Sequence, residues 1–320
     1  MSRIDPSSRH RLNHGWTYFD RVHADAQGQT VLDFYARRYP HSSREAWRQR
    51  IQNGAVLLDG RRTEPGARLT SGQQLAYHRA PWREPDVPRG FAVLHRDNHV
   101  LAVAKPSGLP VLPGGHHLEN TLLACVRERY GNVPAPVHRL GRGTSGIVLF
   151  ARTPLAKQRL SQDFRSGRIQ KLYRALAADA AMPDRFSVEH PIGRVPYPVI
   201  GALHAVDPHG RPSHSDCRVL HRDPQHNRAL LEVDILTGRP HQIRIHLAAA
   251  GYPLVGDPLY RAGGLPVVPS QDDPLPLPGD CGYHLHAHRI RFSHPETRRT
   301  VTVICLPPPI LRTPEERALQ

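Results

Sequence analysis

The stretch PVHRLGRGTSGIVLFART, residues 136–153, decides the fold. Residues 141–146 match the G-x-G-x-x-G fingerprint of dinucleotide-binding proteins letter for letter. That fingerprint works only where a helix begins at the third glycine, because the helix N–H groups then meet the pyrophosphate. Here Gly146 is followed by an apolar, β-favouring run at residues 147–150. The context therefore excludes a nicotinamide or flavin site.

Short β-favouring runs surround this stretch. They lie at residues 91–95, 100–105, 146–151, 173–178, 229–236 and 299–306. Between them we predict two helices, one near residues 121–130 and one that takes Thr153 as N-cap and ends at Gly167. Because strands and helices do not alternate regularly, the pattern predicts an α+β fold with a mixed, mostly antiparallel sheet and flanking helices.

A smaller unit precedes this region. Its expected elements are a helix at residues 31–39, a second helix opened by a capping-box pattern at 42–45 and closed by Gly54, a hairpin turning at Asp59-Gly60, and a third strand at 72–79. The chain then divides into a loosely held polar lead-in (1–30), the small α/β unit (31–79), a proline-containing linker (80–90), a large domain (91–308) with a proline-rich insertion (261–282), and a frayed tail (309–320).

The chain is strongly basic. Its 320 residues carry 43 Lys and Arg against 28 Asp and Glu, which gives a net charge of +15 and a pI near 10.4. Such an excess is the electrostatic footprint of a nucleic-acid-binding protein. Seven arginines fall in the small unit: Arg37, Arg38, Arg44, Arg48, Arg50, Arg61 and Arg62. We interpret this set as a phosphate-binding surface, the alternative being a solvated face.

Other protein classes and sites are disfavoured. No apolar run approaches the roughly 18 residues of a membrane helix, and the N-terminus has no apolar segment of a secretory signal, so we expect a cytoplasmic protein. The four cysteines lie far apart and form no C-x-x-C pair, which argues against a disulfide scaffold or a cysteine zinc site. His284, His286 and His288 alternate on one strand face, but among 22 histidines we expect no metal site.

Five ordered motifs resemble the RluA-type RNA pseudouridine synthases. They are H-R-L-G-R-G-T-S-G at 138–146, a block from His95 that ends in K-P-S-G at 105–108, K-L-Y-R-A at 171–175, T-G-R-P-H-Q-I-R at 237–244 followed by G-Y-P-L-V-G-D at 251–257, and L-H-A at 285–287 followed by His294-Pro295. Together they cover residues 91–306, and the unit at 31–79 resembles the alpha-L RNA-binding module.

The resemblance implies a reaction and its residues. Such enzymes detach uracil from its ribose in RNA, turn it, and rejoin it through C5. In the family, a tyrosine lies against the uracil, an arginine pairs with a carboxylate, and that carboxylate acts at the glycosidic carbon. Tyr173 and Arg244 occupy the first two positions. Gly141 stands where the family pattern has the Asp, and glycine has no group that reacts.

Three interpretations of Gly141 remain open. Another acid reaches the site, for which Asp97, Asp163 and Asp257 are candidates by their closeness to motifs. Alternatively, an RNA phosphate pairs with Arg244 and the protein binds RNA without reacting. In the third interpretation, the chemistry needs no carboxylate at this position. A carboxylate within about 4 Å of Arg244 would favour catalysis.

The expected RNA contacts extend beyond the reactive residues. They are Arg139, Arg142, Lys105, Arg239 and His241, together with the arginines of the small unit. Lys105 is equally explained as a packing residue of its turn. The resulting prediction is a pseudouridine synthase-like protein that isomerises uridine in structured rRNA or tRNA as a monomer, without a cofactor. The alternative is a catalytically silent RNA-binding factor of the same fold.

Overall fold

The computed structural model describes residues 12–198, 200–268, 270 and 274–319. The chain forms two compact units, which meet in the sequence between Glu84 and Pro85, inside the predicted linker. Each unit has a hydrophobic core of its own.

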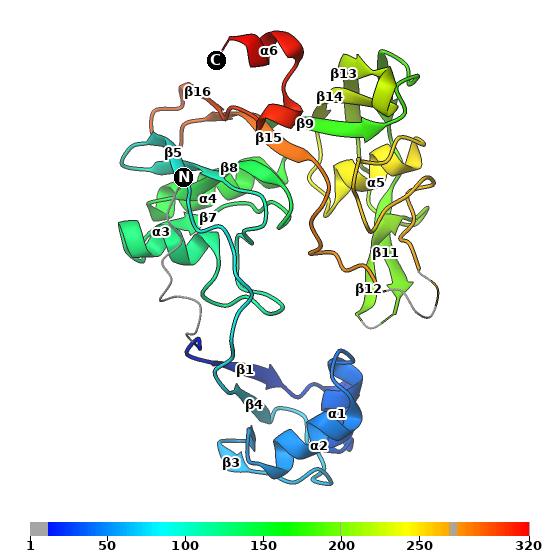
Figure 1. Ribbon diagram of the computed structural model, residues 1–320. Helices are drawn as coiled ribbons and strands as arrows, with labels where there is room; N and C mark the ends of the chain where they lie inside the picture. Colours follow the sequence, from blue (N-terminus) through cyan, green and yellow to red (C-terminus); the bar gives the residue numbers. More distant parts are fainter. Residues whose placement is uncertain (1–11, 199, 269, 271–273, 320) are drawn as a thin grey trace. The chain divides into compact units, whose positions relative to one another are not determined.

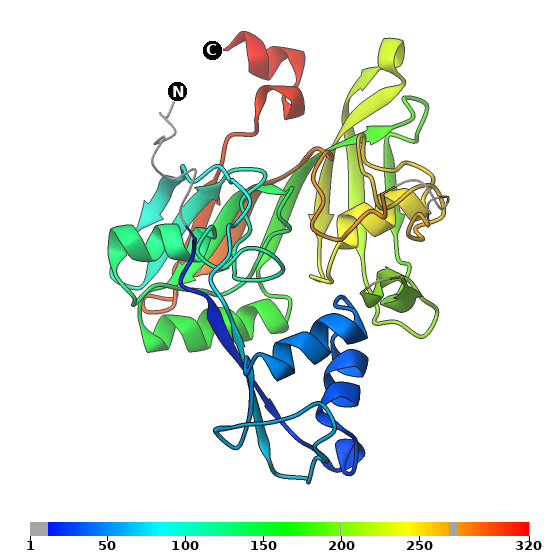
Figure 2. The same cartoon turned by 60° about the horizontal axis from the view of Figure 1, so that its bottom comes forward.

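The N-terminal unit pairs a four-stranded antiparallel sheet with two helices, α1 (Val31–Arg38) and α2 (Arg44–Gln52) (Figure 2). The strand order is β1-β4-β2-β3, with β1 Trp16–Arg21, β2 Val56–Leu58, β3 Arg61–Arg62 and β4 Gln74–Arg79. Tyr35 and Trp47 stack between the helices at 4.6 Å between ring centroids. The predicted hairpin turn is confirmed, because Asp59 and Gly60 both have positive φ and join β2 to β3.

Two sequence expectations for this unit need correction. Residues 1–30 are not merely a lead-in, since β1 pairs along its length with β4. Its side chains are mostly exposed, Phe19 by 66%, so the segment lacks the apolar alternation that marks a strand. The N-cap of α2 is Ser43, whose hydroxyl accepts from the Ala46 N–H, and not Ser42. Residues 1–11 lie outside the described part of the chain.

The large unit is built on a ten-stranded sheet, which confirms the predicted α+β class (Figure 1). Its path runs β10-β13-β14-β9-β15-β8-β6-β5, with β16 on β15 and β7 on β8. The strands are β5 Ala92–Arg96, β6 Val100–Lys105, β7 Ala135–Pro136, β8 Ser145–Ala151, β9 Gln170–Ala178, β10 Arg185–Val188, β13 Ser215–Asp223, β14 Arg228–Ile235, β15 Leu285–Ser293 and β16 Thr300–Ile304. β15 and β8 run parallel, and the other described pairs are antiparallel. β11 (Ile192–Tyr197) and β12 (Gly201–Val206) form a separate hairpin.

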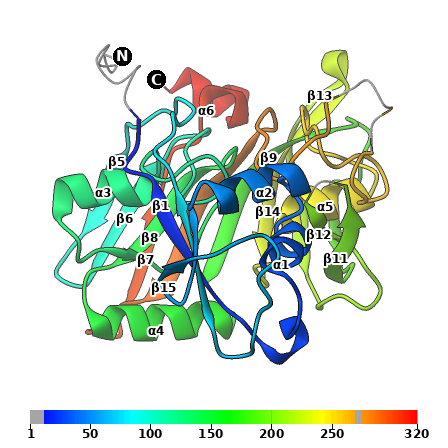
Figure 3. The same cartoon turned by 90° about the horizontal axis from the view of Figure 1, so that it is seen from below.

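Helices cover both faces of this sheet. α3 (Leu122–Tyr130) and α5 (Gln242–Ala249) share one core with β6, β8, β9 and β14, whereas α4 (Pro154–Arg165) packs on the other core with β15 and β16. Figure 3 shows α3 and α4 on opposite sides of β6 and β8. This arrangement follows from strand alternation: Leu101 and Val103 face one core, Val100 and Ala102 the other.

The sequence did not reveal α5 or the C-terminal helix. Residues 242–248 are all buried, so α5 has no polar stripe, and its alternating isoleucines resemble a strand. The expected frayed tail is wrong: Leu311 is buried, and α6 (Pro314–Ala318) is opened by a complete capping box between Thr313 and Glu316. Glu316 also pairs with Arg174 at 2.8 Å.

The third glycine of the fingerprint has an architectural role. Gly146 lies inside β8 with φ of 109°, and a Cβ there would come within 2.3 Å of the Ala287 carbonyl oxygen on β15. Glycine thus allows the two parallel strands to approach, and no helix begins at this position.

Buried neutral histidines make the large unit acid-sensitive. His246 on α5 is fully buried, donates from Nε2 to the His190 carbonyl and accepts the Ser215 hydroxyl at Nδ1. Burial lowers its pKa from 6.5 to about 4. The unfolded chain therefore gains a proton near pH 6.5 that the folded chain takes up only near pH 4, and the free energy of unfolding falls across that interval.

We expect His246→Gln to remove this contribution. Between pH 6.5 and 4 its free energy of unfolding should fall by about 3 kcal/mol less than that of the parent protein. Urea titrations at several pH values measure the difference, and His209→Gln, at an exposed histidine, is the control. Equal acid dependence in both variants would contradict the prediction.

Candidate functional site

A cleft of about 690 Å³ opens on the large unit, next to the core shared by α3 and α5. Its walls come from the loop before β8, from β9, from the start of α5 and from the segment that leads into β15. Of the residues expected from the sequence, the cleft brings together Gly141, Tyr173, Arg244, Arg139, Arg142, Arg239 and His241. Segments far apart in the chain thus converge on one hollow.

Tyr173 reaches the cleft from a central strand. It lies on β9, between Val233 of β14 and Ala287 of β15, and is 9% exposed. Burial raises the pKa of its hydroxyl to about 12, so the side chain stays neutral at physiological pH. An aromatic ring held rigidly in this way presents a flat, uncharged surface to whatever enters the cleft.

Arg244 is held by a buried carboxylate. Its Nε and Nη2 donate to Asp257 Oδ2 and Oδ1, both at 2.7 Å, and the two side chains are 2% and 1% exposed. Asp257 Oδ1 also accepts the N–H groups of Leu259 and Tyr260. The distance lies within the limit of about 4 Å set from the sequence, and of the three candidate acids only Asp257 pairs with Arg244. Because Asp257 does not line the cleft, it positions Arg244 there.

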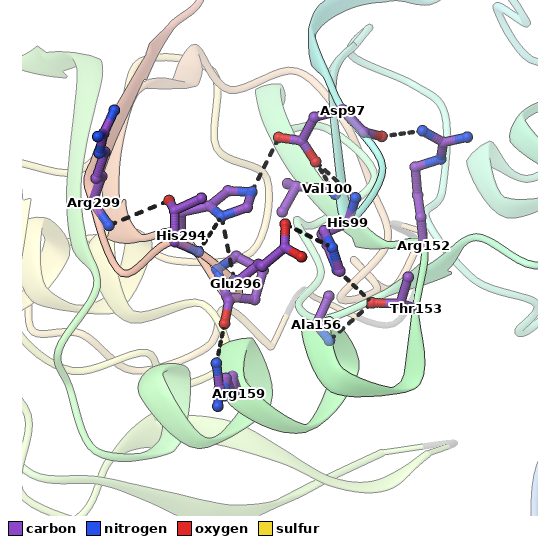
Figure 4. Close-up of polar contacts among 12 residues, drawn as sticks. Asp97, His99, Val100, Arg152, Thr153, Ala156, Arg159, His294, Glu296 and Arg299 are labelled. Carbon is purple, nitrogen blue, oxygen red and sulfur yellow. Dashed lines mark hydrogen bonds and ion pairs between the residues drawn. The ribbon is translucent and has the colours of Figure 1, made fainter.

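The other two candidate acids belong elsewhere. Asp97 accepts from the N–H groups of His99 and Val100 and lies 3.3 Å from His294 Nε2, in the cluster of Figure 4. Burial opposes ionisation, but these hydrogen bonds lower the pKa of Asp97 to about 2. Asp163 on α4 pairs with Arg168 at 2.6 Å. Neither carboxylate contacts the cleft.

Gly141 leaves room for a residue that the sequence did not single out. A Cβ on Gly141 would lie 3.0 Å from the Tyr283 hydroxyl, and one on Gly143 would lie 2.9 Å from Tyr283 Cζ. Tyr283 is 4% exposed, and its ring lies over Arg244 with Cζ of the guanidinium 4.2 Å from the centroid. The absence of a side chain at Gly141 and at Gly143 therefore makes room for the buried phenol of Tyr283. Tyr283 lies just before the L-H-A motif and belongs to none of the motifs, so the sequence did not mark it as a site residue.

His241 has a defined tautomer. Its Nδ1 lies 2.9 Å from Tyr260 Oη, and that hydroxyl donates its proton to the His204 carbonyl at 2.6 Å. His241 must therefore carry its proton on Nδ1, which leaves Nε2 as an acceptor. Burial, with Arg244 as a lesser cause, lowers the pKa of His241 to about 3, so the ring is neutral. Arg239 lies beside it and donates to the Pro212 carbonyl.

Lys105 does not contact the cleft, contrary to its expected role in RNA binding. It is 2% exposed, and its ammonium donates to the carbonyls of Pro106, Leu109 and Arg142. Ser107 in the same turn donates to the Gly143 carbonyl. The K-P-S-G turn thus fixes the backbone of the glycine loop, in line with the packing alternative.

The proline-rich insertion contributes to the cleft. Arg142 Nε donates to the Gly279 carbonyl at 2.6 Å, and Arg244 Nη1 to the Pro278 carbonyl at 3.3 Å. Asp280 lines the cleft, the one acidic residue of the described chain to do so, and lies 3.9 Å from Arg142. The sequence marked this segment only as an insertion, and its residues 269 and 271–273 lie outside the description.

Four of the seven arginines predicted to bind phosphate have acidic neighbours, and Arg50 donates to the Ser42 hydroxyl. Arg38 pairs with Asp20 at 2.9 Å and Arg44 with Asp33 at 2.6 Å. Arg37 and Arg48 lie 4.0 and 3.6 Å from carboxylates. Arg61 and Arg62 on β3 are exposed and have no acidic partner among the described residues. The predicted phosphate surface is therefore most strongly positive at the β2–β3 hairpin.

The alternating histidines do not converge on a metal. His286 and His288 both hydrogen-bond the Cys305 carbonyl, and His286 Nδ1 also meets the Ser145 hydroxyl at 2.8 Å. Within the described residues no group of His, Cys, Asp and Glu could hold a metal ion. No helix in the described part of the chain is long and apolar enough to span a membrane.

Comparisons with known proteins agree on one family. Residues 99–249 match the family model described as RNA pseudouridylate synthase. An uncharacterized RNA pseudouridine synthase of Synechocystis sp. is 44% identical, with 90% of this chain and 98% of the relative covered. RNA pseudouridine synthase 5 of Arabidopsis thaliana is 40% identical, with 94% and 95% covered. Ribosomal large subunit pseudouridine synthase D of Pseudomonas aeruginosa is 31% identical, with 84% and 86% covered.

A solved structure shares the fold. Human RNA pseudouridylate synthase domain containing 1 aligns with a TM-score of 0.54 at 23% identity, over 74% of this chain and 96% of that one. This likeness concerns the backbone architecture of the sheet and its helices.

Asp257→Asn tests the buried pair. The substitution leaves the Arg244 guanidinium without its counter-charge, so we expect the free energy of unfolding to fall by about 3–5 kcal/mol. Urea denaturation measures the loss. Asp184→Asn is the matched control, because Asp184 is 88% exposed where it pairs with Arg222, and we expect a loss below about 1 kcal/mol there. Similar losses in both variants would contradict the structural role of the pair.

Proposed function

The chain belongs to the family of RNA pseudouridylate synthases, and we propose that it isomerises a uridine of structured ribosomal or transfer RNA to pseudouridine. The observation that carries the proposal is the convergence of Tyr173 and the paired Arg244 on one cleft of about 690 Å³. That volume lies within the range of small-ligand sites and accommodates a nucleotide turned out of its helix. Ribosomal RNA is favoured by the names of relatives such as the Pseudomonas aeruginosa protein.

Five residues of the cleft have roles in this proposal besides Arg244. Tyr173 lies against the uracil face, where its neutral ring supports stacking. Arg139, Arg142 and Arg239 at the cleft contact phosphates beside the turned-out nucleotide. His241 accepts a hydrogen bond at Nε2 from the nucleotide, because Tyr260 fixes the proton on Nδ1. The reaction rearranges bonds within one nucleotide, so we propose no cofactor, and the RNA supplies the large partner surface of a monomeric enzyme.

The function is tested on total ribosomal and transfer RNA from a strain that lacks the gene. We expect purified protein to restore pseudouridine at a defined position, read by chemical labelling and primer extension. Tyr173→Leu keeps apolar volume but removes the stacking face, so we expect a 10- to 100-fold slower reaction, about 1–3 kcal/mol. Tyr173→Phe, which retains the ring, is the control and should keep most of the rate. Absence of any restored pseudouridine would overturn the proposal.

The hairpin arginines are tested separately. We expect Arg61→Gln with Arg62→Gln to weaken RNA binding and to reduce the slope of log affinity against log salt by about 1–2, because two phosphate contacts are lost. Filter binding at several salt concentrations measures the slope. Arg185→Gln with Arg218→Gln removes the same charge from exposed positions of the large unit and should leave the slope near the parent value. Equal slopes in the two double variants would show that the hairpin is not part of the RNA-binding surface.

A further inference from the structure

We propose that the Tyr283 hydroxyl is the group that reacts at the ribose C1′ carbon, in the position that the family resemblance assigns to a carboxylate. The inference rests on the proposed function, since it concerns the chemistry of the same cleft. It adds a catalytic residue that neither the sequence motifs nor the comparisons identify.

The first argument is position. An aspartate at residue 141 would place its carboxylate beyond Cβ, and the Tyr283 hydroxyl lies 3.0 Å from that Cβ position. Gly143 makes room for the same ring, since a Cβ there would lie 2.9 to 3.1 Å from Tyr283 Cζ, Cε1 and Oη. The phenol oxygen therefore lies in tight contact with the point from which a carboxylate at 141 would extend. Two glycines in one loop are explained by one side chain.

The second argument is elimination among nearby groups. Asp257 is 1% exposed, and both its oxygens are engaged by Arg244, with Leu259 and Tyr260 donating as well. Asp280 lines the cleft but is 41% exposed and accepts from the Leu277 N–H. A solvated carboxylate of that kind does not combine burial with closeness to Arg244, whereas Tyr283 does.

The surroundings of Tyr283 suit a transient negative charge on oxygen. The Arg244 guanidinium lies 4.2 Å from the ring centroid, and the Thr144 hydroxyl lies 3.3 Å from Oη. Burial raises the pKa of Tyr283, although Arg244 and Thr144 act in the opposite direction. The phenol therefore keeps its proton until a leaving group accepts it, and tyrosine is among the side chains that form covalent intermediates.

The proposed steps balance without a co-reactant. Oη bonds to C1′ as the C1′–N1 bond breaks, and the phenolic proton passes to uracil N1, which gives a ribosyl–tyrosine ether and neutral uracil. After the uracil turns, C5 bonds to C1′ and the C1′–Oη bond breaks. The proton of C5 then returns to Oη. The product is pseudouridine with a proton on N1, and the tyrosine is regenerated.

Tyr283→Phe removes a single oxygen and keeps the ring that packs on Arg244. We expect its single-turnover rate on RNA from the strain that lacks the gene to fall at least about 1,000-fold, while RNA affinity and thermal midpoint stay near the parent values. Asp280→Asn tests the cleft carboxylate, and Tyr252→Phe repeats the same chemical change on a tyrosine outside the cleft. Tyr252→Phe is the control and should stay within about fivefold of the parent rate.

A rescue variant separates chemistry from packing. Gly141→Asp alone adds a side chain 3.0 Å from the hydroxyl, so we expect no gain in rate. The double variant Gly141→Asp with Tyr283→Phe lacks the hydroxyl oxygen that crowds residue 141. We expect its reaction rate to be at least about tenfold higher than that of Tyr283→Phe.

The outcomes distinguish the two proposals. An active parent protein whose Tyr283→Phe variant stays within tenfold of its rate overturns the role of Tyr283 and leaves the proposed function intact. Loss of activity in Asp280→Asn with retention in Tyr283→Phe assigns the chemistry to Asp280. A parent protein that forms no pseudouridine overturns the proposed function, and this inference with it.

Discussion

The buried ion pair between Arg244 and Asp257 is the constraint on which the cleft depends. Arg244 comes from the first turn of α5 and Asp257 from the turn that follows this helix, so their two hydrogen bonds of 2.7 Å close the loop between them. Asp257 also accepts the Tyr260 N–H, and Tyr260 in turn orients His241. The guanidinium also packs on the ring of Tyr283, 4.2 Å from its centroid. The Asp257 carboxylate therefore fixes three parts of the cleft: the Arg244 guanidinium, the acceptor Nε2 of His241 and the ring of Tyr283.

The pair also separates two kinds of positive charge. Burying an arginine is unfavourable unless its charge is compensated, and Asp257 supplies that compensation inside the protein. Arg142 and Arg239 keep more contact with solvent and donate to backbone carbonyls, and Arg142 also lies 3.9 Å from the exposed Asp280. The cleft thus remains attractive to phosphate while its interior is electrically balanced. This balance holds before RNA arrives, so binding does not have to reorganise the interior.

The sequence predicted β5, β6, β8, β9, β14 and β16, together with α3, α4 and the hairpin turn, because these elements carry local signals: apolar runs, the Thr153 cap and Asp59-Gly60. It did not mark β10, β11, β12 or β13. It missed α5, whose residues are buried all round the helix, and β1, whose side chains are mostly exposed. Neither element has apolar residues on one face and polar residues on the other. Tyr173 and Arg244, which the motif positions singled out, both line the cleft. Tyr283 escaped because its importance arises from closeness to Gly141, which is 142 residues away in the sequence and is brought near only by the parallel pairing of β15 with β8.

That pairing has an evolutionary consequence. The backbone contact at Gly146 sets the separation of the two strands, so neither the glycine loop nor the segment before β15 can drift to relieve crowding. A side chain at residue 141 and the hydroxyl of residue 283 would lie in tight contact, at 3.0 Å from Cβ to oxygen. A lineage that replaces one of these groups by the other passes through an intermediate protein. That intermediate has either both groups, in close contact, or neither of them. Among relatives, the two positions should therefore change as a linked pair, and intermediates between the two arrangements should be rare.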